Sequence, residues 1–216
     1  MLKIIVGNKR YSSWSLRGWL AARQSGLPCE ELMLPMWTEQ YDAAKRDGLL
    51  PSGKVPTLWD GDLAVWDSLA IVEHLAERAG RDLYWPTDPA ARAFARSISA
   101  EMHSGFAPLR QHCGMNLRRR YPGFAVNSDT QADIDRIVAL WTEARARFGA
   151  GGDYLFGDFG AADIMFAPVV TRFVTYDVAL PEVAEDYVDA VVAHPFMVEW
   201  QAGADAETLV IDKYEY

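Results

Sequence analysis

Hydroxyl side chains gather between an apolar run and a helix-forming segment near the start of the chain. Within the sequence Tyr11-Ser12-Ser13-Trp14-Ser15, the serines at 12 and 15 stand three positions apart. A disulfide oxidoreductase carries two cysteines at this spacing, and serine cannot form a disulfide, so thiol–disulfide exchange is not expected. At a helix N-terminus a serine hydroxyl can instead donate a hydrogen bond to an anion such as a thiolate, or it can simply cap the helix.

Two further segments place polar groups beside an expected strand and an expected helix. Pro56 has no backbone N–H to donate to a neighbouring strand, and it therefore suits the first position of a strand. A cis bond before it would turn the backbone of Val55 outward, toward a peptide ligand, whereas an ordinary trans bond would not. Asp67-Ser68 begins a helical pattern, where free N–H groups and a hydroxyl can bind an anion and the carboxylate can meet an ammonium or cap the helix.

The elements that must position these residues follow from apolar runs and turn residues in the first 80 positions. Asp60-Gly61 lies between two short apolar runs, which is a strong hairpin signal. From Asp67 onward the apolar residues recur with the period of a helix. We therefore expect a strand at 2–6, a helix at 15–24, a strand at 29–34, hairpin strands at 57–59 and 63–66, and a helix from 67 to about 79.

The rest of the chain is expected to be helical. Residues 81–89 are rich in turn formers and lack periodicity, so they are expected to link two domains. Beyond them we expect a helix over 90–121 that Pro108 kinks or breaks, and further helices at 129–148, 161–176 and 182–192. The basic run Arg118-Arg119-Arg120 is expected at the C-terminal end of the first of these helices, where it would complement the helix dipole.

Composition narrows the class of protein. Half of the 216 residues are hydrophobic, which is enough for a sizeable core, and the formal net charge is −9. That charge argues against nucleic acid or an anionic membrane as a partner. No apolar run approaches the roughly 20 residues needed to span a bilayer, and the start is too short for the apolar part of a signal peptide, so we expect a cytoplasmic protein.

Metal binding and disulfide formation are not expected. Cys29 and Cys113 are too few for a disulfide framework and stand in no metal-ligand spacing. His103 and His112 are nine residues apart, which places them on opposite sides of a helix. The sequence therefore predicts no metal cofactor.

The order and spacing of the Ser-Ser turn, the Val-Pro strand, the Asp-Gly hairpin and the Asp-Ser helix resemble the cytosolic glutathione transferase family. The likeness continues into the segment 157–163, which is similar to the family's helix-capping motif, although Gly160 stands where the family has Ser or Thr. It implies an α/β thioredoxin-like domain (βαβ-ββα) over residues 1–80, a linker at 81–89, and an all-helical domain over 90–216. It also implies a homodimer.

The resemblance implies that glutathione, as co-substrate, is activated as a thiolate for attack on a small electrophile, typically in detoxification. The motif Ser12-Ser13-Trp14 is most similar to the zeta-class Ser-Ser-Cys motif, whose first serine is catalytic. By position the catalytic candidates are Ser12, then Ser13, then Tyr11. Glutathione would contact Lys54, Val55, Pro56, Asp67 and Ser68, and the second substrate would contact Trp37, Glu101 and His103.

Two alternatives remain open at the level of sequence. One is a glutathione transferase-like protein that binds glutathione or partners without catalysis, in which Ser12 would be only a helix cap. The other is a glutathione-dependent cis–trans isomerase of the zeta type, for which the tryptophan at position 14, in place of cysteine, is a departure.

Overall fold

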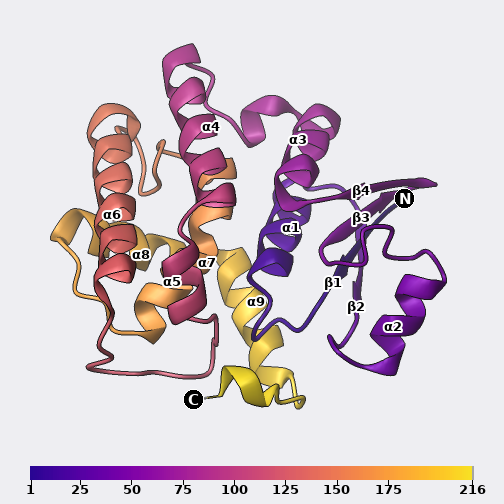
Figure 1. The fold of residues 1–216 in the computed structure, drawn as a ribbon. Coiled ribbons are helices and arrows are strands. Elements are labelled where there is room, and N and C mark those ends of the chain that lie inside the picture. The colour runs from indigo at the N-terminus through magenta and orange to yellow at the C-terminus, as the bar shows by residue number, and fades with distance from the viewer. Residues whose placement is uncertain (216) are drawn as a thin grey trace.

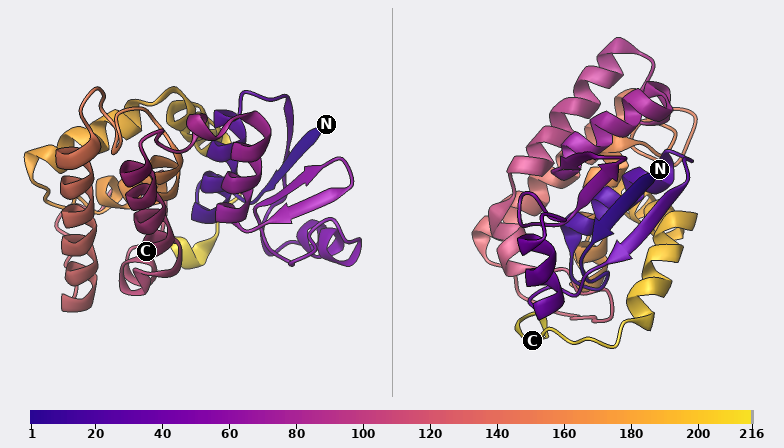
Figure 2. Two further views of the ribbon diagram at one scale, coloured as in Figure 1. Left: turned by 90° about the horizontal axis from the view of Figure 1, so that it is seen from above. Right: turned by 90° about the vertical axis from the view of Figure 1, so that its right-hand side faces the viewer.

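A computed structural model describes residues 1–215 of the chain. Its first part is a four-stranded sheet in the order β2-β1-β3-β4, with β1 and β2 parallel and the other neighbours antiparallel. Helices α1 and α3 lie between this sheet and the helical half, and α2 lies on the other side of the sheet (Figures 1 and 2). The bounds are β1 Leu2–Val6, α1 Ser13–Gln24, β2 Cys29–Met33, α2 Glu39–Arg46, β3 Thr57–Asp60, β4 Leu63–Trp66 and α3 Ser68–Ala79.

The first strand is buried on both faces because both faces of the sheet are covered. Side chains alternate along a strand, so Ile4 and Val6 pack into the main core with α1 and α3, while Ile5 packs against α2. This burial explains why the run at 2–6 is apolar at every position except Lys3, which pairs with Glu30, rather than alternating. The predicted thioredoxin-like order of elements is confirmed.

Two features of this half differ from the expectation. Helix α1 begins two residues earlier than expected, because Ser12 rather than a later residue is its N-cap. Helix α2 was not expected from its polar sequence; Thr38 caps it, and its Tyr41 and Ala44 bury one narrow face against the sheet. A short 3-10 helix, η1 Arg81–Leu83, then leads toward the second half.

The second half is helical, as predicted. Figures 1 and 2 show its helices gathered on one side of α1 and α3. The predicted division at residues 81–89 stays a proposal. The bounds of the helices are α4 Pro89–Ser104, α5 Ala107–His112, α6 Ser128–Phe148, α7 Ala161–Thr175, α8 Glu182–Ala193 and α9 Pro195–Ala206, followed by η2 Asp212–Tyr214.

The expected single helix over 90–121 is wrong in its second part. A break occurs near Pro108, as expected, but it begins earlier, at Gly105 and Phe106, where the latter adopts a left-handed conformation with φ 58°. The segment between α5 and α6 is not helical. Arg118, Arg119 and Arg120 therefore do not end a helix; the second of them pairs with Glu215 instead.

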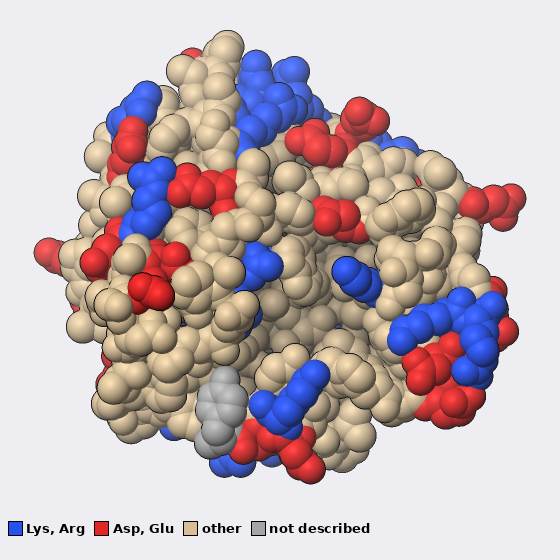
Figure 3. All heavy atoms as spheres, viewed as in Figure 1, with Lys and Arg blue, Asp and Glu red and all other residues tan. Residues whose placement is uncertain are grey.

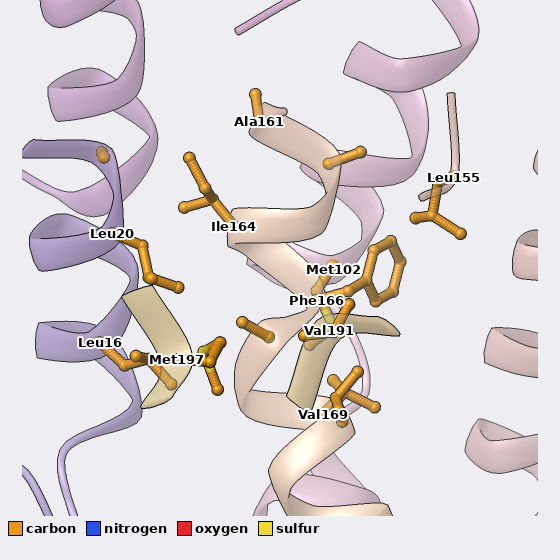
Figure 4. Close-up of a cluster of buried hydrophobic side chains, with 14 of the residues drawn as sticks. Leu16, Leu20, Met102, Leu155, Ala161, Ile164, Phe166, Val169, Val191 and Met197 are labelled. Carbon is orange, nitrogen blue, oxygen red and sulfur yellow. The ribbon is translucent and has the colours of Figure 1, made fainter. Parts of the chain in front are cut away.

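The two halves share one hydrophobic core. Leu16 and Leu20 of α1 pack toward Ile164 of α7 and Met197 of α9, and all four are almost completely buried (Figure 4). Burying one such side chain contributes about 1.5–3 kcal/mol. The contact fixes α1, and with it the serine turn, against the helical half.

The start of α7 explains the glycine in the capping motif. The Asp163 carboxylate accepts hydrogen bonds from the Gly160 N–H at 2.9 Å and the Leu155 N–H at 3.2 Å. A Cβ atom on residue 160 would lie 2.8 Å from the carbonyl oxygen of Tyr84, which itself accepts the Ala161 N–H at 2.8 Å. A side chain is therefore sterically excluded where the family pattern has Ser or Thr.

Candidate functional site

The serine turn is a hydrogen-bonded unit at the N-terminus of α1. The Ser12 hydroxyl caps the helix by accepting the Ser15 N–H at 3.3 Å, and the two hydroxyl oxygens lie 2.8 Å apart. The Ser15 hydroxyl also accepts the Gly7 N–H from the end of β1 at 2.8 Å. Ser12 keeps a small exposed fraction of 7%, whereas Ser15 is fully buried. The outer hydroxyl of the pair is thus the one that a ligand can reach.

Tyr11, the third catalytic candidate, is engaged elsewhere. Its hydroxyl donates a hydrogen bond of 2.6 Å to the Glu215 carboxylate, and its ring stacks on Tyr214. Burial, followed by the hydrogen bond to Glu215, raises the pKa of the phenol. A phenol with a raised pKa that donates to a carboxylate is a poor candidate for stabilising a second anion.

The C-terminal segment 207–215 lies across this turn, and we call it the C-terminal strap. It runs back from α9 beneath the space between the two halves (Figure 1). The Glu207 carboxylate accepts hydrogen bonds from backbone N–H groups at Lys9 and Arg10. At its far end Glu215 also accepts a hydrogen bond from the Asn116 amide. Sequence reasoning missed this element, because its partners lie about 100 to 200 residues away.

The N-terminus of α3 carries two of the candidate glutathione contacts. The Ser68 hydroxyl is fully buried and has no hydrogen-bond partner among residues 1–215. Asp67 has φ 74°, which is strained for a residue other than glycine, and its carboxylate accepts the Leu69 N–H at 2.9 Å. Strain beside an unsatisfied buried hydroxyl is typical of a binding site.

A cavity of about 360 Å³ connects these groups. Val55, in its wall, makes no backbone–backbone hydrogen bond with another described residue, and the Val55–Pro56 peptide bond is cis. The Val55 N–H donates a hydrogen bond to the Tyr41 hydroxyl, so the Val55 carbonyl is the group that an extended peptide can pair with. The lining residues are Trp14, Ser52, Lys54, Val55, Pro56, Trp66, Asp67 and Ser68.

Trp14 brings the serine turn to this cavity, although Ser12 is not itself a lining residue. The indole contacts the His103 ring edge to face at 5.3 Å between centroids. His103 Nε2 lies 3.2 Å from the Asp67 carboxylate, so α4 reaches the same site. The guanidinium carbons of Arg17 and Arg110 lie 4.6 and 4.8 Å from the centre of the indole.

The structure brings together all five predicted glutathione contacts and His103, but not the other candidates. Glu101 forms a two-fold ion pair with Arg136 at 2.7 and 2.9 Å. Trp37 lies outside the cavity wall and contacts the strap, with the Lys213 ammonium 3.5 Å from its ring centre. Ser13 occupies the first turn of α1 and makes no side-chain hydrogen bond among residues 1–215.

Sequence reasoning also missed Arg17 and Arg110. Nothing in an isolated arginine on an expected helix distinguishes a buried guanidinium from an exposed one. Helix α1 is buried on nearly all sides between the sheet and α7, and this is what places Arg17 inside.

The stretch 1–215 contains no group of three His, Cys, Asp or Glu side chains placed to hold a metal ion, and none of its helices has the length and hydropathy of a membrane span.

Comparison with known proteins identifies the relatives of the chain. Residues 11–78 match the family model "Glutathione S-transferase, N-terminal domain", and residues 70–203 match "Glutathione S-transferase, C-terminal domain". Glutathione S-transferase GstB of Escherichia coli is 30% identical over 155 residues, which cover 67% of this chain and 74% of the relative. A probable maleylacetoacetate isomerase of Caenorhabditis elegans is 28% identical over 160 residues, covering 73% and 72%.

Solved structures agree on the fold. A glutathione transferase homologue from Burkholderia, with bound glutathione, superimposes with a TM-score of 0.70 at 22% identity, covering 95% of this chain and 99% of that one. A holo structure of maleyl pyruvate isomerase, a bacterial zeta-class protein, gives a TM-score of 0.72 at 22% identity, covering 96% and 100%.

Proposed function

The chain belongs to the glutathione S-transferase family, and from this premise we propose that it binds glutathione in the cavity beside Trp14 and activates it as a thiolate. One observation carries the proposal: the buried hydroxyl of Ser68, at the free N-terminus of α3, has no partner among residues 1–215. A helix N-terminus favours a carboxylate, and an unsatisfied buried hydroxyl needs a hydrogen-bond partner.

Each part of the tripeptide has a counterpart in the cavity. The γ-glutamyl carboxylate meets Ser68 and the N–H groups of α3, and its ammonium meets Asp67. The cysteinyl N–H pairs with the Val55 carbonyl, which makes no backbone–backbone hydrogen bond with another described residue. The glycyl carboxylate meets the exposed ammonium of Lys54.

The serine turn can supply the free energy that activation of the thiol requires. A free thiol of pKa about 8.5 is only a few per cent ionised at neutral pH. Lowering that pKa by about two units requires roughly 2.7 kcal/mol of selective stabilisation of the thiolate. A hydrogen bond from Ser12 to the charged sulfur supplies about 1.5–3 kcal/mol, and the α1 dipole about 0.3–1 kcal/mol. The thiolate then attacks a small electrophile held on the helical side of the cavity.

Assembly and location follow the same family inference. We propose a cytoplasmic homodimer. The exposed edge strand β4 carries Leu63 and Trp66, which are 56% and 50% exposed, and a second copy would cover such apolar side chains.

The isomerase alternative rests on the two relatives whose names describe isomerases. In that reaction the same thiolate adds to a double bond and is later eliminated. The non-catalytic alternative rests on the hydrogen bond between Ser12 and Ser15, which is what a purely structural cap would also make.

Calorimetry with reduced glutathione tests the proposal. We expect saturable binding to the wild type, at least tenfold weaker binding to Ser68→Ala, and unchanged binding to Ser97→Ala, a control on the exposed face of α4. Thiolate absorbance in the ultraviolet, followed against pH, then tests activation. Absence of binding at millimolar glutathione would overturn the proposed function, and binding without a lowered thiol pKa would favour the non-catalytic alternative.

A further inference from the structure

Arg17 is a charged side chain buried inside the fold. Only 2% of the residue is exposed, and its Nε donates a hydrogen bond of 2.9 Å to the Met165 carbonyl on α7. Its two terminal nitrogens have no hydrogen-bond partner among residues 1–215. Both terminal nitrogens keep some contact with solvent, because neither is among the buried, unpartnered polar atoms of residues 1–215. The small opening of this residue therefore includes the end that carries the donors.

The charge of Arg17 is not balanced by a nearby carboxylate. No acidic side chain of residues 1–215 forms an ion pair with Arg17 or Arg110. Burial lowers the pKa of Arg17, and the like charges of Arg172 and Arg110 lower it further, while the more distant Asp67 opposes them. A guanidinium stays protonated in proteins, so the fold bears the free-energy cost of a desolvated cation.

This uncompensated charge lies beside the cavity. Arg17 and Arg110, from α1 and α5, both lie against the indole of Trp14, which lines the cavity together with Asp67 and Ser68. The indole N–H likewise has no hydrogen-bond partner among residues 1–215. Figure 3 shows cationic side chains on the walls of the hollow between the two halves, although the chain as a whole has a net charge of −9.

We propose that Arg17 and Arg110, with the N–H of Trp14, form a subsite that binds a carboxylate of the second substrate. The inference rests on the proposed function, because the subsite lies beside the cavity assigned to glutathione. The two carboxylates of glutathione already have counterparts at Lys54 and at the N-terminus of α3. The remaining anions are the thiolate and a carboxylate on the electrophile. One terminal nitrogen of Arg110 donates to backbone carbonyls of Met102, His103 and Gly105, which holds its guanidinium in place and leaves its other donors for a ligand. Planar guanidinium groups match the geometry of a carboxylate better than that of a single sulfur atom.

The test uses two glutathione conjugates that differ in one charge. S-benzylglutathione and S-(4-carboxybenzyl)glutathione are titrated by calorimetry into the wild type, Arg17→Met, Arg110→Gln and the control Arg23→Met, which removes an exposed arginine on the same helix. We expect the carboxylate to tighten binding at least tenfold in the wild type and in the control. We expect Arg17→Met and Arg110→Gln to abolish that gain without changing the affinity for the uncharged conjugate. If Arg17→Met does not fold, Arg110→Gln alone decides the result.

The other outcomes separate the two proposals. Equal affinity for both conjugates in the wild type, or a gain that survives in Arg17→Met and Arg110→Gln, would overturn the carboxylate subsite while leaving the glutathione site intact. A wild type that gains nothing from the carboxylate, together with a raised thiol pKa of bound glutathione in Arg17→Met, would assign the cation to the glutathione sulfur and overturn the subsite. Failure of both conjugates to bind the wild type would overturn the proposed function itself.

Discussion

The hydroxyl oxygens of Ser12 and Ser15 lie 2.8 Å apart, and the inner one also accepts the N–H of Gly7. Each hydroxyl has one proton to donate and two lone pairs. Without a ligand the Ser12 hydroxyl donates to the Ser15 oxygen. Hydroxyl protons rotate, so Ser15 can donate to Ser12 instead, and the proton of Ser12 is then free to point outward. The buried serine can therefore orient the outer one toward a thiolate without any movement of the backbone.

Replacement of Ser12 by alanine should impair activation rather than binding. The hydrogen bond lost is charge-assisted and is worth about 1.5–3 kcal/mol, so the pKa of bound glutathione should rise by about one to two units. The thiolate absorbance of the complex, titrated against pH, measures this change. Ser13→Ala, at the adjacent position, serves as the control and should leave the titration unchanged. An unshifted pKa in Ser12→Ala would remove this residue from the mechanism.

Replacement of Ser15 by alanine should have a smaller effect of the same kind. Ser12 would keep its own hydroxyl but lose the donor that orients it, so we expect the thiol pKa of bound glutathione to rise by about half a unit to one unit, in line with a neutral hydrogen bond of about 0.5–1.5 kcal/mol. A merely structural role would lower the free energy of unfolding and leave the titration of the complex unchanged. Measuring both quantities on the same variant distinguishes the two roles.

The sequence predicted the elements around the candidate site better than the long-range contacts between them. Local signals, such as the Val-Pro strand and the Asp-Gly hairpin, give β3, β4 and the start of α3 almost to the residue, because turn chemistry is decided locally. The strap could not be predicted, since its anchors at Lys9 and Asn116 are remote in sequence. The charge of Arg17 gave no sign of its burial, which depends on how α1 packs against α7.

The strap should loosen in acid. Although burial opposes it, hydrogen bonds from Tyr11, Arg119 and Asn116 lower the pKa of the Glu215 carboxyl below that of an ordinary glutamate. A lowered pKa in the folded state stabilises the strap at pH values above the unfolded pKa of about 4.3, and this stability is lost as the pH falls through the lower folded value. Burial raises the pKa of Glu207 at the other end of the strap, so the loosening should begin at Glu215. Hydrogen exchange of residues 211–215 should therefore accelerate below about pH 4 before the core opens.

Tyr11→Phe should release the strap at neutral pH. The variant removes the hydrogen bond to Glu215 but keeps the ring that stacks on Tyr214. We expect faster cleavage by trypsin after Lys213 and an unchanged thiolate titration, because the phenol is not the activating group. Tyr154→Phe, which removes a hydroxyl far from the strap, is the control. A raised thiol pKa in Tyr11→Phe would contradict this division of roles.

Gly160→Ser should destabilise the protein, although serine is the better helix cap. Capping preference alone favours serine over glycine by only a few tenths of a kcal/mol. The new Cβ would lie 2.8 Å from the backbone oxygen of Tyr84, which cannot move without breaking its hydrogen bond from Ala161. Overpacking of this kind costs about 1–3 kcal/mol, so the steric penalty outweighs the gain. Denaturant unfolding should show a lower midpoint for Gly160→Ser than for the wild type, and a higher midpoint would mean that η1 and α7 can separate to admit the side chain.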